Sequence, residues 1–196
     1  MAKPRKTSRS APAKPAAARA KTTKSAPQKA PTAALPPRRA GEVRYWLMKS
    51  EPDVFSFDDL WAAPHRTSGW DGVRNFQARN YMRDAMAVGD GVLFYHSNAE
   101  PPHIAGIAEV ASLAYPDPTQ FDAASEYFEP RATPDAPVWM QVDVRAVARF
   151  TSPVTLPMLK TSKGLEGLEL LRKGSRLSVQ VVSPLHWSRI TKLGGL

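Results

Sequence analysis

Alternation of apolar and polar side chains predicts a series of short strands along this chain. The clearest segment is residues 138–147, where Val138, Met140, Val142 and Val144 alternate with polar neighbours, as in a strand that buries one face. Four other segments have the composition of strands and are bounded by turn residues. The predicted strands are residues 43–50, 92–96, 104–110, 138–147 and 177–182.

Short helices are expected between these strands. Ser56, with Asp59 three residues later, has the pattern of a helix N-cap, and Asn75 can cap a second helix whose apolar face includes Phe76 and Met82. Further helical pieces are predicted around residues 156–160 and 165–172. Many short strands with few short helices favour an α+β protein with a mixed β-barrel or sandwich over a parallel α/β sheet.

Two glycine or proline signals interrupt this pattern. Gly106, inside the predicted strand 104–110, indicates a bulge or the close approach of another backbone. Strands 92–96 and 104–110 are close enough in sequence to form a hairpin. Residues 115–137 contain five prolines and are expected to form a long irregular stretch.

Charge is concentrated at the N-terminal end. The first 40 residues hold 11 Lys or Arg, 12 Ala, 7 Pro and no acid, so the remaining 156 residues hold 16 basic and 18 acidic side chains. A segment with so few large apolar residues cannot offset the entropy lost on ordering. We therefore predict a disordered basic tail at residues 1–42 and one near-neutral domain at residues 43–192. The tail is expected to bind polyanions without specificity.

Several classes of site are excluded by the residue inventory. The sequence has no cysteine, which excludes disulfides and thiolate zinc sites, and its four histidines show no H-x-x-x-H spacing. No phosphate-binding glycine motif follows a strand. No apolar run approaches the roughly 18 residues of a membrane span, and the N-terminus lacks the apolar core of a signal peptide. We expect no cofactor, no metal and no membrane partner.

A series of short motifs runs in order through residues 43–190. The motifs are residues 46–52 (WLMKSEP), 70–79 (WDGVRNFQAR), 89–90 (GD), 94–97 (FYHS), 106–110 (GIAEV), Trp139 with 142–144 (VDV), and 176–179 (RLSV). Together these motifs resemble the EVE domain family, and their combination is much more specific than any one of them. Two positions depart from the family pattern: Glu129 stands where Asp is expected before proline, and His103 where glycine is usual.

The resemblance implies a PUA-like fold, which is a mixed β pseudobarrel with short flanking helices, within the α+β class. It further implies a pocket between the barrel and its helices that binds a modified nucleobase in DNA or RNA without catalysing a reaction. We accordingly expect a monomer whose partner is nucleic acid. Its expected location is the cytoplasm, with nucleoid association in a bacterium, or the nucleus in a eukaryote.

A pocket for one base needs aromatic rings that converge with fixed polar groups. A base read from a duplex has to be extruded, and stacking on an aromatic ring contributes roughly 1 to 3 kcal/mol per base. The candidate walls are Trp46, Trp70 and Tyr95. Core packing is the alternative role of Trp46, whereas Trp70 lies in a glycine-containing loop beside polar residues. The core or its edge is the assignment for Trp61, Trp139 and Trp187.

The polar candidates lie at predicted strand ends and at a helix start. Strand ends gather at the mouth of a barrel, where hydroxyl and amide groups can discriminate the edge of a base. Guanidinium groups suit flanking phosphates because they are forked donors. The polar pocket candidates are Lys49, Ser50, Asn75, His96 and Ser97, and the phosphate candidates are Arg74 and Arg79. Helix capping is the alternative role of Asn75, and a solvated helix face that of the arginines.

Two other functions remain open from the sequence. His96, with Glu51 or Asp90 as an acid-base partner, would support hydrolysis of a nucleotide or base. Residues 115–137 would instead serve to dock a protein partner, although only the length of this stretch suggests it. No G-x-S-x-G elbow and no acidic cluster for magnesium is present, so our expectation is a protein that is not an enzyme.

Overall fold

The computed structural model describes residues 35–196. Residues 1–34, and with them most of the predicted tail, lie outside the described residues. The family resemblance starts at residue 43, so the described part contains the whole predicted domain.

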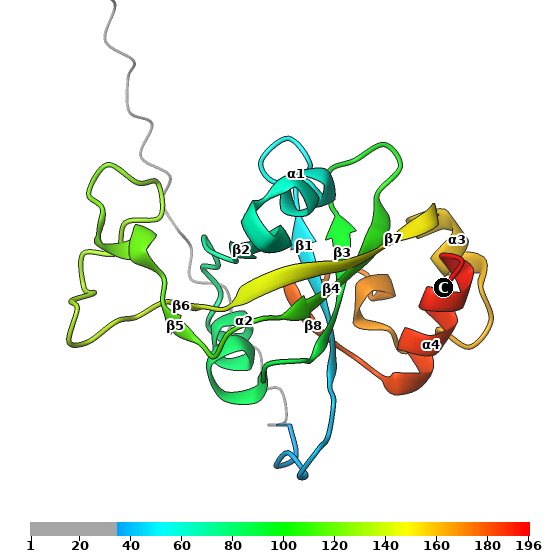
Figure 1. The fold of residues 1–196 in the computed structure, drawn as a ribbon, viewed down its shortest axis with the longest axis horizontal. Coiled ribbons are helices and arrows are strands. Elements are labelled where there is room, and N and C mark those ends of the chain that lie inside the picture. The colour runs from blue at the N-terminus through cyan, green and yellow to red at the C-terminus, as the bar shows by residue number, and fades with distance from the viewer. Residues whose placement is uncertain (1–34) are drawn as a thin grey trace, which may run out of the picture. The chain divides into compact units, whose positions relative to one another are not determined.

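A curled six-stranded mixed sheet forms the centre of the domain, with the strand order β2-β7-β4-β3-β1-β8 (Figure 1). Its strands are β1 (Tyr45–Ser50), β2 (Thr67–Gly69), β3 (Gly91–His96), β4 (His103–Val110), β7 (Asp143–Thr155) and β8 (Val179–Val182). β1 and β3 run parallel, and the other neighbours pair antiparallel. A separate ribbon pairs β5 (Tyr115–Pro116) with β6 (Met140–Gln141). The predicted fold class is confirmed.

Short helices connect the strands. They are α1 (Phe57–Ala62), α2 (Phe76–Asn80), α3 (Leu156–Thr161) and α4 (Pro184–Leu193), with 3-10 turns η1 (Pro64–Arg66), η3 (Pro118–Phe121) and η4 (Glu169–Leu171) and a π-helical turn η2 (Tyr81–Ala85). The predicted cap at Ser56 is confirmed, because its hydroxyl accepts the Asp59 N–H at 3.1 Å while the Asp59 carboxylate accepts the Ser56 N–H at 2.8 Å. The Asn75 cap is confirmed as well.

Sequence patterns missed or misplaced some boundaries. The strand predicted at residues 138–147 is divided into β6 and β7, and β7 continues to Thr155. The helical piece predicted at residues 165–172 is only the short turn η4. β2 and α4 were not predicted, although Ser183 followed by Pro184 is a helix-start signal, and Ser183 does accept the His186 N–H at 3.1 Å.

Gly106 fulfils both predicted roles. The β4–β7 register shifts between Ile104 and Gly106. A Cβ at Gly106 would lie 2.5 Å from the Ala148 carbonyl oxygen and 2.7 Å from the Phe57 ring. Any side chain there would displace backbone, so glycine permits the close packing of α1 on the sheet.

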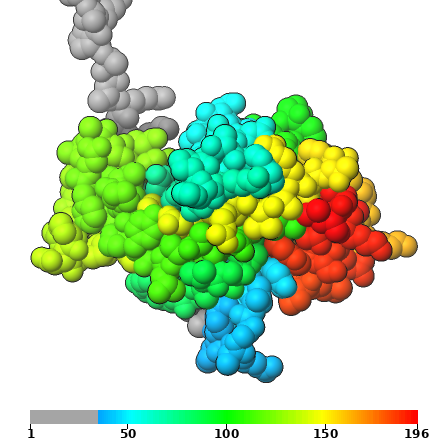
Figure 2. Space-filling model, viewed as in Figure 1, coloured from blue at the N-terminus to red at the C-terminus, as the bar shows by residue number. Residues whose placement is uncertain are grey.

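Alternation along the central strands divides the core into two clusters. Trp46, Met48 and Phe94 belong to the first cluster, with residues of α1 and α2. Leu47 and Leu93 belong to the second, with residues of α3 and α4. Figure 1 shows α3 and α4 together, away from α1 and α2. In Figure 2 the chain from α3 onwards, in orange and red, covers one end of the domain, and residues 115–137, in yellow-green, cover the other.

The segment before β1 is fastened to the domain. Residues 35–42 were predicted as tail, yet Leu35 packs against the first cluster and Arg38 donates two hydrogen bonds, of 2.8 and 2.6 Å, to the Asp90 carboxylate. This carboxylate is 1% exposed and also accepts from the Trp46 indole N–H and from the backbone N–H groups of Arg44 and Ala87. Leu35 and Arg38 of the predicted tail are thus held against the domain, because the buried carboxylate gains Arg38 as its charged partner.

Within residues 35–196 every helix is too short or too polar to span a membrane.

Asp90→Asn is expected to destabilise the protein by about 3 kcal/mol, because the change leaves the Arg38 charge without its buried partner. Burial raises the pKa of Asp90, but the bonds from Arg38, Trp46 and the backbone outweigh burial and leave the pKa below its ordinary value. The urea midpoint measures the loss. Asp84→Asn is the matched control: this carboxylate pairs with Arg83 at the exposed surface, so about 1 kcal/mol or less is expected. Equal effects of the two substitutions would contradict the role of Asp90.

Candidate functional site

Parallel pairing of β1 and β3 brings four of the predicted polar residues to the same end of the sheet: Lys49, Ser50, His96 and Ser97. Ser50 and His96 are register partners at the ends of these strands. The Ser50 carbonyl accepts both the backbone N–H of Ser97 at 2.8 Å and its hydroxyl at 3.1 Å. The Ser50 hydroxyl donates to the Phe55 carbonyl at 2.6 Å. The two serines therefore tie the strand ends together.

Successive side chains of a strand point to opposite sides of the sheet, and this alternation separates the other candidates into two groups. Trp46 and Trp70 belong to the first core cluster, and His96 contacts Phe94 of that cluster. Tyr95 belongs to the second cluster. Lys49 is the register partner of Tyr95, so its side chain lies on the same side of the sheet. Burial lowers the pKa of Lys49, and the charge of Glu169 in η4 opposes that shift. One pocket cannot collect all the predicted side chains.

The three aromatic candidates are all largely buried. Trp46 has no exposed surface, and its indole N–H is bonded to Asp90 at 2.9 Å, so the structure gives it the alternative role of core packing. Tyr95 is 4% exposed and faces the second cluster. Trp70 is 6% exposed and lies edge-on to Phe94, with ring centroids 5.2 Å apart. Of the three, Trp70 alone lies in a loop, between β2 and α2.

His96 is held by hydrogen bonds on both ring nitrogens. Its Nε2 accepts the Phe57 backbone N–H at 3.0 Å, and its Nδ1 lies 3.2 Å from Nε2 of His103. His103 Nδ1 lies 2.8 Å from the Pro101 carbonyl. One set of neutral tautomers satisfies the chain: Nδ1 of each ring carries the proton, so His103 donates to Pro101 and His96 donates to His103.

The acid-base pair considered for hydrolysis is not assembled. Asp90 precedes β3 and His96 ends it, so the strand separates them by roughly 20 Å. Glu51 accepts from the Asn98 amide at 3.3 Å, while both His96 nitrogens contact other groups. No group of three or more His, Asp or Glu in the described residues is arranged to hold a metal ion.

All the N–H groups of the Arg74 guanidinium donate hydrogen bonds within the protein. It donates to the Asp117 carboxylate at 2.7 Å, to the Thr119 hydroxyl at 2.9 Å, twice to the Tyr127 carbonyl at 2.6 and 3.2 Å, and to the Val73 carbonyl at 3.3 Å. These bonds employ all five N–H donors. The structure therefore shows Arg74 as the anchor of the proline-rich loop (residues 117–137) and leaves it no donor for a phosphate.

Asn75 and Arg79 lie at the surface of α2. The Asn75 side-chain oxygen caps the helix by accepting from Gln77 and Ala78 N–H groups. Arg79 donates to the Val138 carbonyl at 2.8 Å and to the Asn80 side chain. Burial, followed by the charge of Arg83, lowers the pKa of Arg79.

The proline-rich loop contributes an aromatic residue that sequence reasoning missed. Tyr127 packs on Gly72, where a Cβ would lie 3.0 Å from its ring, and Gly72 has a φ of +69°. Burial raises the pKa of Tyr127, and the negative charges of Glu126, Asp71 and Glu51 add to this effect. Tyr127 therefore lies against the Trp70 loop. The glycine at position 72 is the sequence signal that could have indicated close packing there.

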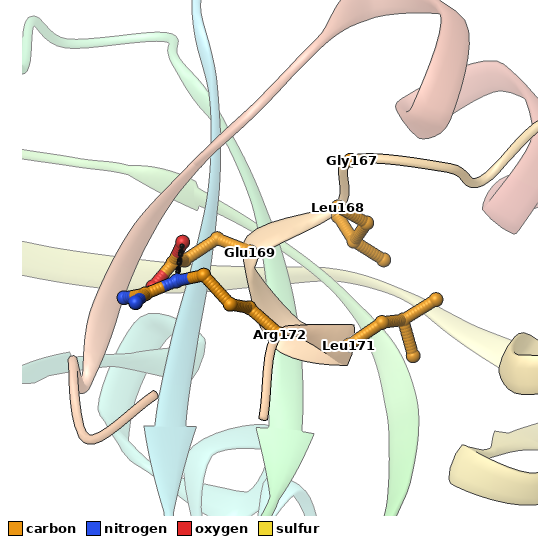
Figure 3. A pocket seen from close by; sticks show the side chains of 5 residues that line it. All are labelled: Gly167, Leu168, Glu169, Leu171 and Arg172. Carbon is orange, nitrogen blue, oxygen red and sulfur yellow. Dashed lines mark hydrogen bonds and ion pairs between the residues drawn. The ribbon is translucent and has the colours of Figure 1, made fainter. Parts of the chain in front are cut away.

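A concavity lies on the side of the sheet that faces α3 and α4. It has a volume of about 290 Å³ and is lined by Gly167, Leu168, Glu169, Leu171 and Arg172 (Figure 3). Glu169 pairs with Arg172 and accepts the Ser175 hydroxyl at 2.6 Å. Lys49 approaches this side, but the aromatic candidates Trp46 and Trp70 do not.

Residues 44–193 match the family model described as the EVE domain. The chain belongs to the EVE domain family. This match covers every strand and helix of the described structure, so the sheet, both core clusters and the proline-rich loop are parts of one EVE domain.

Curated relatives of this EVE domain include Thymocyte nuclear protein 1 of two mammals. The mouse protein is 44% identical over 126 residues, which cover 60% of this chain and 55% of the mouse protein. The human protein is 40% identical over 166 residues, which cover 76% of this chain and 73% of the human protein. The chain thus spans little more than half of the mouse relative.

Solved structures of similar sequence have the same fold. A hypothetical protein from Leishmania major is 50% identical, with a TM-score of 0.73, and the match covers 80% of this chain and 98% of that one. Human THYN1, solved in complex with DNA that contains 5-methylcytosine, is 38% identical, with a TM-score of 0.73 over 78% of this chain and 98% of that one.

His96→Gln is expected to reduce the loss of stability of the EVE domain under mild acid. Burial, followed by the charge of His103, lowers the pKa of His96, although Asp58 and Asp59 oppose the shift. Below about pH 6.5 the unfolded chain takes up a proton that the folded protein does not bind, so stability falls as the pH falls toward the depressed pKa. Urea unfolding at a series of pH values between about 7.5 and 5.5 measures this. The exposed His65→Gln is the control, and an unchanged pH dependence in His96→Gln would contradict the assignment.

Proposed function

We propose that this EVE domain binds a modified nucleobase in nucleic acid and catalyses no reaction on it. The observation that carries the proposal is the human THYN1 structure with 5-methylcytosine DNA, whose fold and 38% identity extend over 78% of this chain. A domain of the same family with the same arrangement of strands provides the same scaffold. Modified cytosine in DNA is accordingly the first ligand to test.

The base is proposed to enter beside Trp70, at a mouth defined by Ser50, Trp70, Asn75, Ser97 and Tyr127. Phe94 links these elements, because its ring contacts both Trp70 and Phe55, and Phe55 holds the Ser50 hydroxyl. Arg74 fixes Tyr127 against Gly72 in the Trp70 loop. The rings of Trp70 and Tyr127 are the stacking surfaces proposed for one extruded base.

Polar groups at the mouth supply the means of discrimination. Asn75 is exposed at the start of α2; its side-chain oxygen caps the helix, so its NH2 group is the part that can donate to a base edge. The hydroxyls of Ser50 and Ser97 are committed to backbone carbonyls, so their role is to hold the two strand ends in position. Lys49 and Tyr95 lie on the other side of the sheet and are left out of this mouth.

The arrangement of His96 supports binding without a reaction. A general base needs a nitrogen within hydrogen-bond reach of the proton it removes. Both nitrogens of His96 are held by Phe57 and His103, and Asp90 lies at the opposite end of β3.

Trp70→Phe in the full chain is expected to lower the preference for a 5-methylcytosine oligonucleotide over its unmodified counterpart by about fivefold, since about 1 kcal/mol of stacking is lost. Phenylalanine retains an aromatic ring beside Phe94, so the urea midpoint changes little. Fluorescence anisotropy of the two labelled DNAs gives the preference. Trp187→Phe, the same substitution on α4 where the indole stacks on Tyr45, is the matched control.

The outcomes separate the alternatives. If the wild-type protein binds DNA with and without 5-methylcytosine equally well, the proposal that the domain recognises this modified base is wrong. Conversion of the oligonucleotide, detected by mass spectrometry, would show an enzyme. A preference unchanged in Trp70→Phe would place the base elsewhere in the domain.

The basic N-terminal segment is proposed to add affinity without selectivity. Residues 1–34 contain nine Lys or Arg and no acid. Each phosphate neutralised by such a side chain releases counterions, which makes binding salt-dependent but independent of sequence.

Glutamine at all nine basic positions of residues 1–34 is therefore expected to weaken DNA binding and to flatten the plot of log affinity against log salt concentration. The slope should fall by about 0.9 for each duplex phosphate that the protein no longer neutralises. The ratio of affinities for modified and plain DNA stays constant. Titrations at a series of salt concentrations measure both quantities. Loss of the preference for modified DNA, with no change in the salt slope, would contradict the proposal that the N-terminal segment adds affinity and the domain adds selectivity.

A further inference from the structure

Phe76 has an unusual place for a helix phenylalanine. Its spacing with Met82 predicted a core position, yet its side chain is 52% exposed. Of the seven phenylalanines, all of which lie in the described residues, only Phe76 and Phe128 are exposed. One face of the Phe76 ring stacks on Trp139, with centroids 4.8 Å apart and planes at 27°. The ring is therefore held in a fixed orientation while much of it faces solvent.

A guanidinium group lies over the same ring. The central carbon of Arg79 is 4.9 Å from the Phe76 centroid. The group is held by the Val138 carbonyl and the Asn80 amide oxygen, which are neutral, so its positive charge is not balanced by these contacts. By contrast, Arg83 on the next turn pairs with Asp84. Arg79 thus presents a charge and further N–H donors beside an exposed ring.

A continuous series of contacts joins this platform, Phe76 with Arg79, to the proposed mouth. Trp139, beneath Phe76, lies 5.3 Å from the guanidinium carbon of Arg74. That guanidinium is also 5.1 Å from the Tyr127 ring and donates to the Tyr127 carbonyl. Tyr127 in turn packs on Gly72, two residues after Trp70. The platform and the mouth are therefore neighbours on one rigid surface.

The combination of groups fits a nucleotide better than an apolar protein segment. A base stacks favourably on both an aromatic ring and a guanidinium plane, whatever its sequence, and a phosphate accepts from the remaining arginine donors. The exposed Asn75 amide next to Phe76 adds polar character that an apolar docking patch lacks.

We propose that Phe76 and Arg79 form a second subsite, which stacks the nucleotide adjacent to the captured base and contacts the phosphate that joins the two. This subsite rests on the proposed function, because it needs a captured base beside it. It assigns to Arg79 the phosphate contact that Arg74, fully bonded within the protein, cannot make.

The test is a double-substitution cycle on the full chain. Wild type and Phe76→Leu are each titrated with 5-methylcytosine DNA that has intact neighbours, and with the same DNA carrying an abasic site on the 5′ or the 3′ side. Leucine keeps an apolar cover over Trp139 but removes the ring. With intact DNA, Phe76→Leu is expected to bind about fivefold or more weakly. With DNA abasic at the stacked neighbour, wild type and variant should bind equally.

Matched variants distinguish loss of a contact with DNA from a general change in the fold or surface. Leu185→Ala removes a 57% exposed apolar side chain from α4, on the other side of the sheet, and should bind all DNAs like wild type. Phe76→Tyr retains the ring and should restore binding to intact DNA. Urea midpoints show whether each variant is folded. Arg79→Gln carries the test if the leucine variant is unstable: it should weaken binding to intact DNA and lower the salt slope by about 0.9, and an unchanged affinity and slope would overturn the subsite.

Each outcome decides the proposal. An equal loss of affinity for intact and abasic DNA, or no loss in Phe76→Leu, would overturn the subsite even when wild type prefers the modified base. Failure of wild type to prefer the modified base is a different result, which overturns the proposed function. Binding to free 5-methyldeoxycytidine should be unchanged in Phe76→Leu, since the free nucleoside has no neighbour.

Discussion

The buried carboxylate of Asp90 is the interaction on which the rest of the structure depends. It accepts five hydrogen bonds, from the segment before β1, from the indole of the central strand and from the turn after η2. A buried charge is stable only when hydrogen bonds and an opposite charge replace the water that it loses. The carboxylate therefore fixes where the N-terminal segment joins the domain and how Trp46 is oriented in the first core cluster.

The surface that we connect with nucleic acid is assembled from distant parts of the sequence. Trp70 and Phe76 flank the loop into α2, Tyr127 comes from the proline-rich loop, and Trp139 precedes β6. Arg74 bonds to three residues of the proline-rich loop and thereby holds these parts in one arrangement. A preorganised surface loses little entropy on binding, so rigidity of this loop matters as much as the rings it carries.

Local signals in the sequence predicted local structure well. The Ser56 capping box and the Asn75 cap involve residues three apart, and the strands follow from alternation. The family motifs predicted the fold class. The results of long-range contacts could not be predicted. Arg74 was predicted to bind phosphate, but in the fold its donors are bonded to Asp117 and Tyr127. Phe76 looked buried, but Trp139 covers only one face of its ring. Alternation placed Lys49 and Ser50 on opposite sides of the sheet, although both end the same strand.

The place of β1 in the sheet has a consequence for how the chain is made. β1 lies between β3 and β8, and β8 begins only at Val179. During synthesis, which starts at the N-terminus, β1 and β3 emerge long before the strand that completes the sheet on their open side. A chain interrupted before Val179 exposes a row of unpaired N–H and C=O groups along β1, an edge that invites association with other chains. The domain is therefore complete only when Val179–Val182 have left the ribosome, and its folding speed is limited by this late, distant pairing.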